Sequence, residues 1–572
     1  MRTRLAMLLL VAAAVPLLSE PRADPPVLRA MQEELARSMS GLTIKDQPAP
    51  YYIAYNVLDA TESRLVATLG APVNDLVARM RLLRVDVRVG DYGFDSSRLL
   101  SFDRDAGLLG MLGLSVSPLP VDDDETVMRR QIWLATDAAY KRSVQILAKK
   151  KAAAQNRTDS DPIPDFSREK PLERVEPVAI AQPVDQGWAD TVRRASAIFQ
   201  GAADVVSSDA QLSVSEGTRY FVSSEGFRTV LPARSASFRV NAEVLADDGM
   251  ALHDSVQVIA QSPRDLPPAA DLLARTRRML EDLRATRAGR VGDDYSGPVL
   301  VENEAAASLV AQSLVPLFLS QRAPESDDAR MGSLSQLFST PFLTRIGTRV
   351  MPESFTVRDA PSVQRFGAEP VAGAYAVDDE GLAAEDVTLV RDGRLLTMLT
   401  SRTPQKNLLQ SNGHGRKGGA QAGVLLVESA TAIPAAGLKA KYLDLLKTQG
   451  RTHGYILRRL ETSTARPGDR QGPAIVRAVK VTPDGKEEAV RGLALGNIPH
   501  TAFRDILGAS QERVLFNYQG QSPASMLGGA MVMPGATTLV SVIAPSLIFE
   551  ELDLQKNKQP LPKKPIVNSP IK

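Results

Sequence analysis

The sequence predicts an α+β protein whose C-terminal half is rich in strands. Short apolar stretches with period-two alternation recur within residues 51–89 and 211–244, and turn residues bound them. Helical periodicity is longest over residues 122–155 and 269–287. In the C-terminal half, pairs of strands flank hairpin signals such as Asp392-Gly393. Together these patterns favour a mixed N-terminal region followed by a β-rich C-terminal domain.

Length and charge limit the possible partners. The 572 residues suffice for two to four domains with their own cores. Charged residues make up 23% and nearly cancel, at a net charge of +2, so no bulk charge favours a nucleic-acid partner. The chain contains no cysteine, which excludes disulfides and cysteine nucleophiles.

Residues 1–23 have the pattern of a signal peptide. Arg2 and Arg4 precede an apolar run from Leu5 to Leu18, which is too short to span a bilayer comfortably. We therefore expect a periplasmic or secreted protein of the bacterial envelope. No other run is long enough for a membrane span. An uncleaved amphipathic start on a cytoplasmic protein stays open as an alternative.

Residues 24–121 form the first predicted α+β domain. A helical pattern follows Pro26, and strands are predicted at 51–57, 64–69 and 85–89. Tyr51, Tyr52 and Tyr55 lie together in the first strand, where they form either a ligand platform or part of a half-buried sheet.

A long helix and a linker are predicted over residues 122–172. Acidic residues from Asp122 to Glu125 cap the helix, which continues to about Gln155. Its predicted buried stripe consists of Val127, Ile132, Trp133, Tyr140, Val144 and Leu147. Residues 156–172 are rich in Asp, Ser, Pro and Arg, which is typical of a linker.

Residues 173–290 form the second predicted α+β domain. Its strands turn at Ser224-Glu225-Gly226 and at Asp247-Asp248-Gly249, and a helix over 269–287 ends the domain. The C-terminal β-rich domain follows over residues 291–552. A tail over residues 553–572, rich in Pro and Lys, is predicted to be disordered.

The stretch from Gly297 to Val310 is the most informative part of the chain. Val299, Leu300 and Val301 predict a short buried strand, and the alanines that follow favour a helix. Glu302 and Glu304 fall on the first turn of this helix, where the positive end of its dipole stabilises acidic side chains. A capping role is therefore one interpretation of both glutamates.

This stretch resembles the TldD/PmbA family of metallopeptidases, also called modulators of DNA gyrase. That family's signature is a buried strand leading into a helix with His-Glu-x-x-x-His, and a distant cysteine supplies the third zinc ligand. When Glu304 is laid on the signature glutamate, Asn303 and Ser308 stand at the two histidines, and Phe516 stands at the cysteine. The segments "YFVSSEG" (220–226) and "DVTLVRDGRLLTMLTSR" (386–402) are also similar to this family.

The resemblance implies a TldD/PmbA-type C-terminal domain whose zinc site is degenerate. A catalytic zinc needs three protein ligands and an open position for water, and Asn303, Ser308 and Phe516 do not supply them. Glu304 then occupies a vestigial base position, because there is no metal-bound water for it to activate. No cofactor is expected, or zinc if the site is functional. Whether the chain is an enzyme stays open.

Three further residues are candidates for a peptide cleft. Glu302 lies beside the signature, and His414 and Arg416 lie in a glycine-rich basic loop, which can also be simply a flexible loop. The adjacent acids Asp378 and Asp379 favour a turn over an acid/base pair.

We expect an exported TldD/PmbA-type protein that binds extended peptides by strand addition in the C-terminal domain, or that partners a zinc-bearing TldD-like homologue as a hetero-oligomer. A homodimer is a further possibility. The alternative is an active metallopeptidase that cleaves unfolded peptides with unusual ligands. A third interpretation is a structural protein of the envelope that uses the fold only as a surface.

Overall fold

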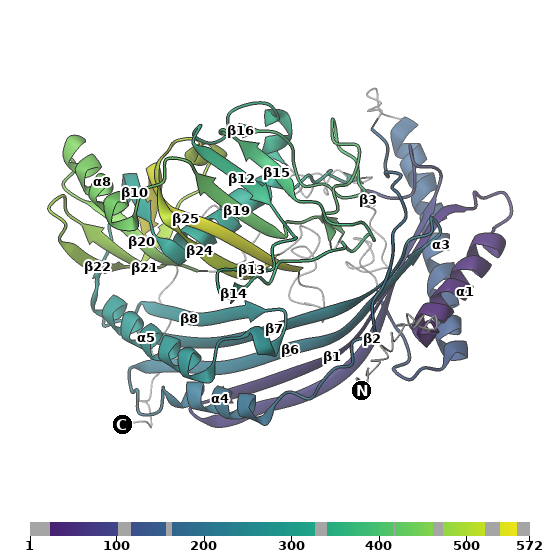
Figure 1. The fold of residues 1–572 in the computed structure, drawn as a ribbon, viewed down its shortest axis with the longest axis horizontal. Helices are drawn as coiled ribbons and strands as arrows, with labels where there is room; N and C mark the ends of the chain where they lie inside the picture. The colour runs from purple at the N-terminus through teal and green to yellow at the C-terminus, as the bar shows by residue number, and fades with distance from the viewer. Residues whose placement is uncertain are drawn as a thin grey trace, which may run out of the picture.

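The chain folds into a long curved sheet and a β-rich domain that rests on its concave side (Figure 1). The computed structural model describes residues 23–100, 116–155, 163–326, 340–416, 418–461, 473–520 and 538–556. The predicted signal peptide, apart from Ala23, and most of the predicted tail lie outside these ranges. No helix in the described ranges is long and apolar enough to cross a membrane.

The N-terminal sheet has the order β4-β2-β1-β6-β7-β5, with β8 also paired to β7. Its strands are β1 (Pro50–Thr68), β2 (Ala71–Val89), β4 (Ser117–Pro118), β5 (Glu173–Val175), β6 (Val205–Ser223), β7 (Arg228–Leu245) and β8 (Ala251–Ala260). Strand β1 pairs antiparallel with both β2 and β6. Regions 24–121 and 173–290, predicted as separate domains, thus contribute to one continuous sheet.

Two of the separately predicted strands belong to one long strand. Segments 51–57 and 64–69 are parts of β1, which is 19 residues long. Tyr52 and Tyr55 are 3% and 0% exposed, so they pack in the core and do not form an open ligand platform.

Helices cover the other face of this sheet at its two ends. At one end lie α1 (Pro26–Gly41) and α3 (Glu125–Gln155), and at the other lie α4 (Gln186–Ala197) and α5 (Ala269–Ala288) (Figure 1). The long helix α3 is confirmed, and Ile132, Tyr140 and Leu147 of its predicted stripe are buried. The rest of the stripe is partly wrong: Val127 and Trp133 are 40% and 43% exposed. The Trp133 ring instead has the Arg37 guanidinium 5.9 Å from its centroid.

The C-terminal domain is built on a twelve-stranded sheet with the order β16-β15-β12-β19-β25-β10-β20-β21-β22-β9, and β23 and β24 pair with β25. Its strands are β9 (Arg290–Val291), β10 (Tyr295–Val301), β12 (Phe355–Asp359), β15 (Val387–Arg391), β16 (Arg394–Leu395), β19 (Val424–Ser429), β20 (Gly454–Leu460), β21 (Ile475–Val481), β22 (Glu487–Arg491), β23 (Leu493–Leu495), β24 (Ile506–Gly520) and β25 (Thr538–Lys556). The short strands outside the two large sheets are β3 (Leu99–Leu100), β11 (Glu325–Ser326), β13 (Arg365–Phe366), β14 (Glu369–Pro370), β17 (Gly415–Arg416) and β18 (Gly419–Ala420).

Strand β10 lies between two helical layers of this domain. Val299 and Val301 join the core that contains α6 (Asn303–Leu309), whereas Leu300 joins the core under α8 (Ala435–Thr448). Side chains alternate across a strand, so a strand covered on both faces is apolar throughout. The predicted buried strand and the helix that follows it are both confirmed. After α6 the chain continues through a π turn and a 3-10 turn to Phe318.

Candidate functional site

The helix that follows β10 is short and closely packed. Asn303 begins α6 with a φ of +48°, a conformation that asparagine adopts more readily than most residues. Its backbone N–H donates to the Ser546 hydroxyl at 2.9 Å. Ala305, Ala306 and Ala307 are at most 1% exposed, so the small side chains that favour a helix also allow its close packing.

Both glutamates of the signature stretch form ion pairs with β20. Glu304 lies 3.2 Å from the Arg459 guanidinium, which also donates to Asp254 of β8 at 2.7 Å. Glu302 lies 3.2 Å from Arg458. Burial raises the pKa of Asp254, and Arg459 opposes that shift. The chain Glu304–Arg459–Asp254 therefore links α6 to the N-terminal sheet.

The three residues that the resemblance places at zinc-ligand positions have other contacts in the structure. The Ser308 hydroxyl accepts a hydrogen bond from the Gln312 amide at 2.9 Å. Phe516 lies on β24 opposite Val542, with its ring 5.7 Å from that of Tyr518. Helix α6 packs against β24 and β25, and its alanines share a core with Phe516.

This donor set does not fit a zinc ion. An amide, a hydroxyl and a phenyl ring do not make the three-ligand set that a catalytic zinc needs. In the described ranges, no group of three or more His, Asp or Glu residues could hold a metal ion.

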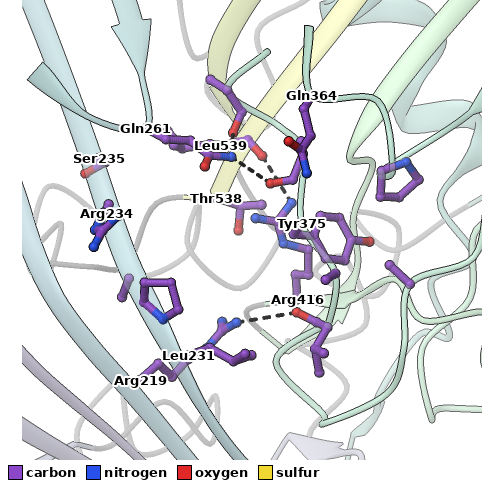
Figure 2. A pocket seen from close by; sticks show the side chains of 18 of the residues that line it. Arg219, Leu231, Arg234, Ser235, Gln261, Gln364, Tyr375, Arg416, Thr538 and Leu539 are labelled. Atoms are coloured by element: carbon purple, nitrogen blue, oxygen red, sulfur yellow. Dashed lines mark hydrogen bonds between the residues drawn. The ribbon is translucent and has the colours of Figure 1, made fainter. Parts of the chain in front are cut away.

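A cavity of about 890 Å³ lies between the concave face of the N-terminal sheet and the C-terminal domain. Figure 2 shows Leu231, Arg234 and Ser235 on one wall and Tyr375 and Arg416 across from them. The charged residues of the lining are Arg174, Glu176, Arg219, Arg234, Asp265, Arg365, Asp379 and Arg416. Arginines outnumber acidic residues in the lining, so the cavity suits an anionic or polar ligand.

Two arginines from different elements approach each other in this cavity. Arg416 donates to the Leu539 carbonyl at 3.1 Å, and its guanidinium carbon lies 4.3 Å from the Tyr375 ring centroid. Arg219 of β6 forms an ion pair with Asp379. Burial, with a further contribution from Arg416, lowers the pKa of Arg219 to about 10. A carboxylate between the two cations would relieve this unfavourable environment.

Of the three predicted cleft residues, only Arg416 lines the cavity. His414 is fully buried, with Nε2 3.2 Å from an Asp359 carboxylate oxygen. Its Nδ1 lies 2.9 Å from the Asn412 carbonyl. Glu302 lies beside Arg458, away from the cavity lining.

Asp378 shapes a turn, as its sequence context predicts. Its carboxylate accepts hydrogen bonds from the backbone N–H groups of Glu380, Leu382 and Gly415, each at 2.9 Å. Burial, and then the neighbouring Glu380 carboxyl, raises the pKa of Asp378 to about 8.

The sequence did not predict an open strand edge in this cavity. On the side of β7 away from β6, residues 228–230 pair with β5 and residues 236–245 pair with β8. Residues 231–235 lie between these partners, have no strand on that side in the described ranges, and all line the cavity. Proline within a sheet is found at edges, strand starts or bulges, so Pro232 is the one residue in this segment that could have indicated an open edge.

The "YFVSSEG" motif forms a second contact between the sheet and the C-terminal domain. Glu225, in the β6–β7 turn, accepts hydrogen bonds from Arg402 at 2.6 and 2.9 Å. Arg402 also donates to the Ser167 carbonyl and stacks over Phe166, 3.8 Å from its centroid.

Comparison with known proteins agrees with this fold. Residues 294–556 match the family model described as the PmbA/TldA metallopeptidase C-terminal domain. Comparison with curated proteins finds no match.

Three solved structures share the fold across most of the chain. A protein from Thermotoga maritima described as a modulator of a DNA gyrase is 13% identical, with a TM-score of 0.57 over 92% of this chain and 99% of its own. TldE from Thermococcus kodakarensis is 12% identical, with a TM-score of 0.56 over 92% and 100%. A protein from Bacteroides thetaiotaomicron, also described as a modulator of DNA gyrase, is 13% identical, with a TM-score of 0.54 over 92% and 98%. Residues 294–556 are therefore a domain of the PmbA/TldA metallopeptidase C-terminal family, and the chain as a whole shares the fold of these three structures.

Proposed function

We propose that this protein is a non-catalytic TldD/PmbA-type member that binds extended peptides in the cavity between its N-terminal sheet and its C-terminal domain. The observation that carries this proposal is the open edge of β7 at residues 231–235, which borders the cavity. An extended peptide can add to such an edge through main-chain hydrogen bonds, while neighbouring pockets select its side chains. The edge belongs to the N-terminal sheet, whereas the sequence suggested strand addition in the C-terminal domain.

The backbone geometry identifies which groups would hold the peptide. The Val230 carbonyl accepts from the Glu176 N–H at 2.9 Å, so the main-chain groups of Val230 point away from β6. Because main-chain polar groups alternate along a strand, those of Pro232 and Arg234 point the same way. Pro232 offers only its carbonyl, and Arg234 offers both an N–H and a carbonyl.

The charges of the cavity favour peptides with a carboxylate. Arg219 and Arg416 lie in a corner where burial lowers the pKa of both guanidinium groups. An acidic side chain or a C-terminal carboxylate could accept hydrogen bonds from them.

A substitution at Arg234 tests the strand edge. Arg234→Pro removes the N–H and should weaken binding of a fluorescent extended peptide at least about tenfold, as measured by anisotropy. Arg234→Gln keeps the N–H, so the loss should be much smaller. Equal affinities for the two variants would contradict strand addition.

Metal analysis tests the non-catalytic part of the proposal. The replacement of all three zinc ligands, at Asn303, Ser308 and Phe516, supports it. We expect less than stoichiometric zinc in the purified protein and no chelator-sensitive hydrolysis of unfolded peptides. Stoichiometric zinc together with such hydrolysis would favour the alternative, an active metallopeptidase.

The proposal extends to export and to a partner. The signal-like residues 1–23 support a periplasmic or secreted location, and N-terminal sequencing of the mature protein tests it. By resemblance, the chain would pair with a zinc-bearing homologue, or with a second copy of itself. Size-exclusion chromatography of the chain, alone and co-expressed with such a homologue, distinguishes the two assemblies.

A further inference from the structure

A second cavity, of about 450 Å³, lies at the other end of the N-terminal sheet. Strand β2, helix α3 and residues 96–100 line it on the N-terminal side. Across from them, the lining includes Ser320, Gln321, Arg322 and Pro324 of the C-terminal region. None of its lining residues belongs to the peptide cavity described above.

The charged lining of this cavity is predominantly basic. It consists of Arg84, Asp86, Arg88, Arg98, Arg142 and Arg322. Behind it, the Asp165 carboxylate faces Lys150 at 2.5 Å, Arg98 at 2.7 Å and Arg322 at 3.8 Å. Asp95 pairs with Arg88, and Glu325 lies near Arg98. These carboxylates reduce the positive charge around the cavity.

Three buried polar atoms at this cavity have no hydrogen-bond partner in the described part of the chain. They are the hydroxyl oxygens of Ser97 and Ser320 and Nε of Arg98. Ser320 is only 3% exposed. Buried polar groups in folded proteins are nearly always paired, so three orphans at one basic cavity point to a ligand that accepts hydrogen bonds.

The wall formed by α3 and β2 also has an apolar part. Ala135, Ala139 and Ile146 of α3 face the cavity together with Leu83 and Val85 of β2. Pockets of this size, with an apolar lining and a few placed polar groups, suit small organic ligands.

We propose that this second cavity binds a small organic anion, whose carboxylate or phosphate contacts Arg98, Arg142 and Ser320 and whose short apolar body packs on Ala135 and Ala139. Burial, together with the charge of Arg322, lowers the pKa of Arg98 to about 10, and an anion would offset this. The proposal does not depend on peptide binding in the first cavity.

Calorimetry at constant ionic strength, with the full chain and four probes, tests this site. Octanoate and octyl phosphate carry both the anion and the apolar body, octanol lacks the charge, and inorganic phosphate lacks the body. We expect at least one of the two charged amphiphiles to bind at least about tenfold more tightly than octanol and inorganic phosphate. The tighter of the two identifies the preferred oxyanion. If neither binds, or if octanol binds equally well, the proposal is wrong. Tight binding of inorganic phosphate would contradict the proposed contact between the ligand's apolar body and helix α3.

Variants locate the site. Arg142→Gln should weaken binding about fivefold through loss of a charge-assisted contact, while Arg130→Gln, the same change at an exposed position of α3, should not. Ser320→Ala should weaken binding without lowering the melting temperature of the free protein, because its hydroxyl has no partner to lose. Ala139→Leu should block binding by filling the cavity. Wild-type affinity in the Arg142 and Ser320 variants would overturn the assignment, even if the Ala139 variant fails to fold.

Discussion

The N-terminal sheet and the C-terminal domain meet at two arginines with opposite surroundings. Arg402 is fully buried, holds both oxygens of Glu225 and stacks over Phe166, so its contact is closed. Arg416 has a carbonyl partner and the Tyr375 ring, and it borders an open cavity of about 890 Å³. The first contact holds the two parts together, and the second leaves room for a ligand.

The closed contact should give the largest effect on stability. Arg402→Met leaves Glu225 without its buried counter-charge, and we expect a loss of about 3–5 kcal/mol in the free energy of unfolding. Urea denaturation followed by circular dichroism measures it. Adding Glu225→Gln should recover part of the loss, because it removes the uncompensated charge. If Arg402→Met alone is as stable as the wild type, this contact does not hold the two parts together.

The open contact should affect binding and leave stability nearly unchanged. Arg416→Met removes a cation that hydrogen-bonds carbonyls and packs on a ring, and whose charge also interacts with Asp359 and Asp378, so unfolding should change much less than in Arg402→Met. Affinity for an acidic extended peptide should fall about tenfold, which corresponds to about 1.4 kcal/mol. Anisotropy and thermal unfolding measure the two effects. Arg391→Met, on the exposed end of β15, is the matched control. Lost stability with unchanged affinity would reverse the roles assigned to the two arginines.

The sequence predicted elements whose pattern is local. The turns at Glu225, Asp248 and Asp392 and the helices α3 and α5 are where alternation, periodicity and turn residues indicate them. Strand β1 was predicted in two pieces because the polar residues from Asp59 to Ser63 interrupt its apolar alternation.

The sequence could not predict contacts between distant segments. Arg402 and His414 are fully buried because Glu225 and Asp359, 177 and 55 residues away, supply their partners. His414 was therefore assigned to a cleft from its glycine-rich surroundings alone. The open edge of β7 depends on where β5 and β8 end, which no local pattern specifies.

A third link between the two parts joins Arg459 to Asp254 of β8, and the contribution of Glu304, the outer member of this chain, should be smaller. Its side chain is 45% exposed and pairs with Arg459. Glu304→Gln should therefore cost no more than about 1 kcal/mol of unfolding free energy. Any background hydrolysis of unfolded peptides should be the same in wild type and variant. A wild-type peptidase activity that this substitution abolishes would make Glu304 a working base and would contradict the proposed loss of catalysis.

The pair of His253 on β8 with Glu461 should contribute least to stability, and its contribution should depend on pH. The hydrogen bond that His253 donates to Glu461 raises the pKa of His253 above 6.5, so the histidine's contribution to stability is full below pH 6.5 and is lost as pH rises through the folded-state pKa. The same bond lowers the pKa of Glu461, whose contribution is lost as pH falls below 4.5. Because the imidazole is 52% exposed, the effect should be only a few tenths of a kcal/mol.

Urea denaturation between pH 5 and 8 can distinguish the effect of His253 from that of His453, whose pKa is shifted in the opposite direction. His253→Gln should remove a decline in stability with rising pH. Burial instead lowers the pKa of His453, so its contribution is lost as pH falls, and His453→Gln should remove a slope of the opposite sign. If both variants change the slope in the same direction, the His253–Glu461 pair does not join the two parts in solution.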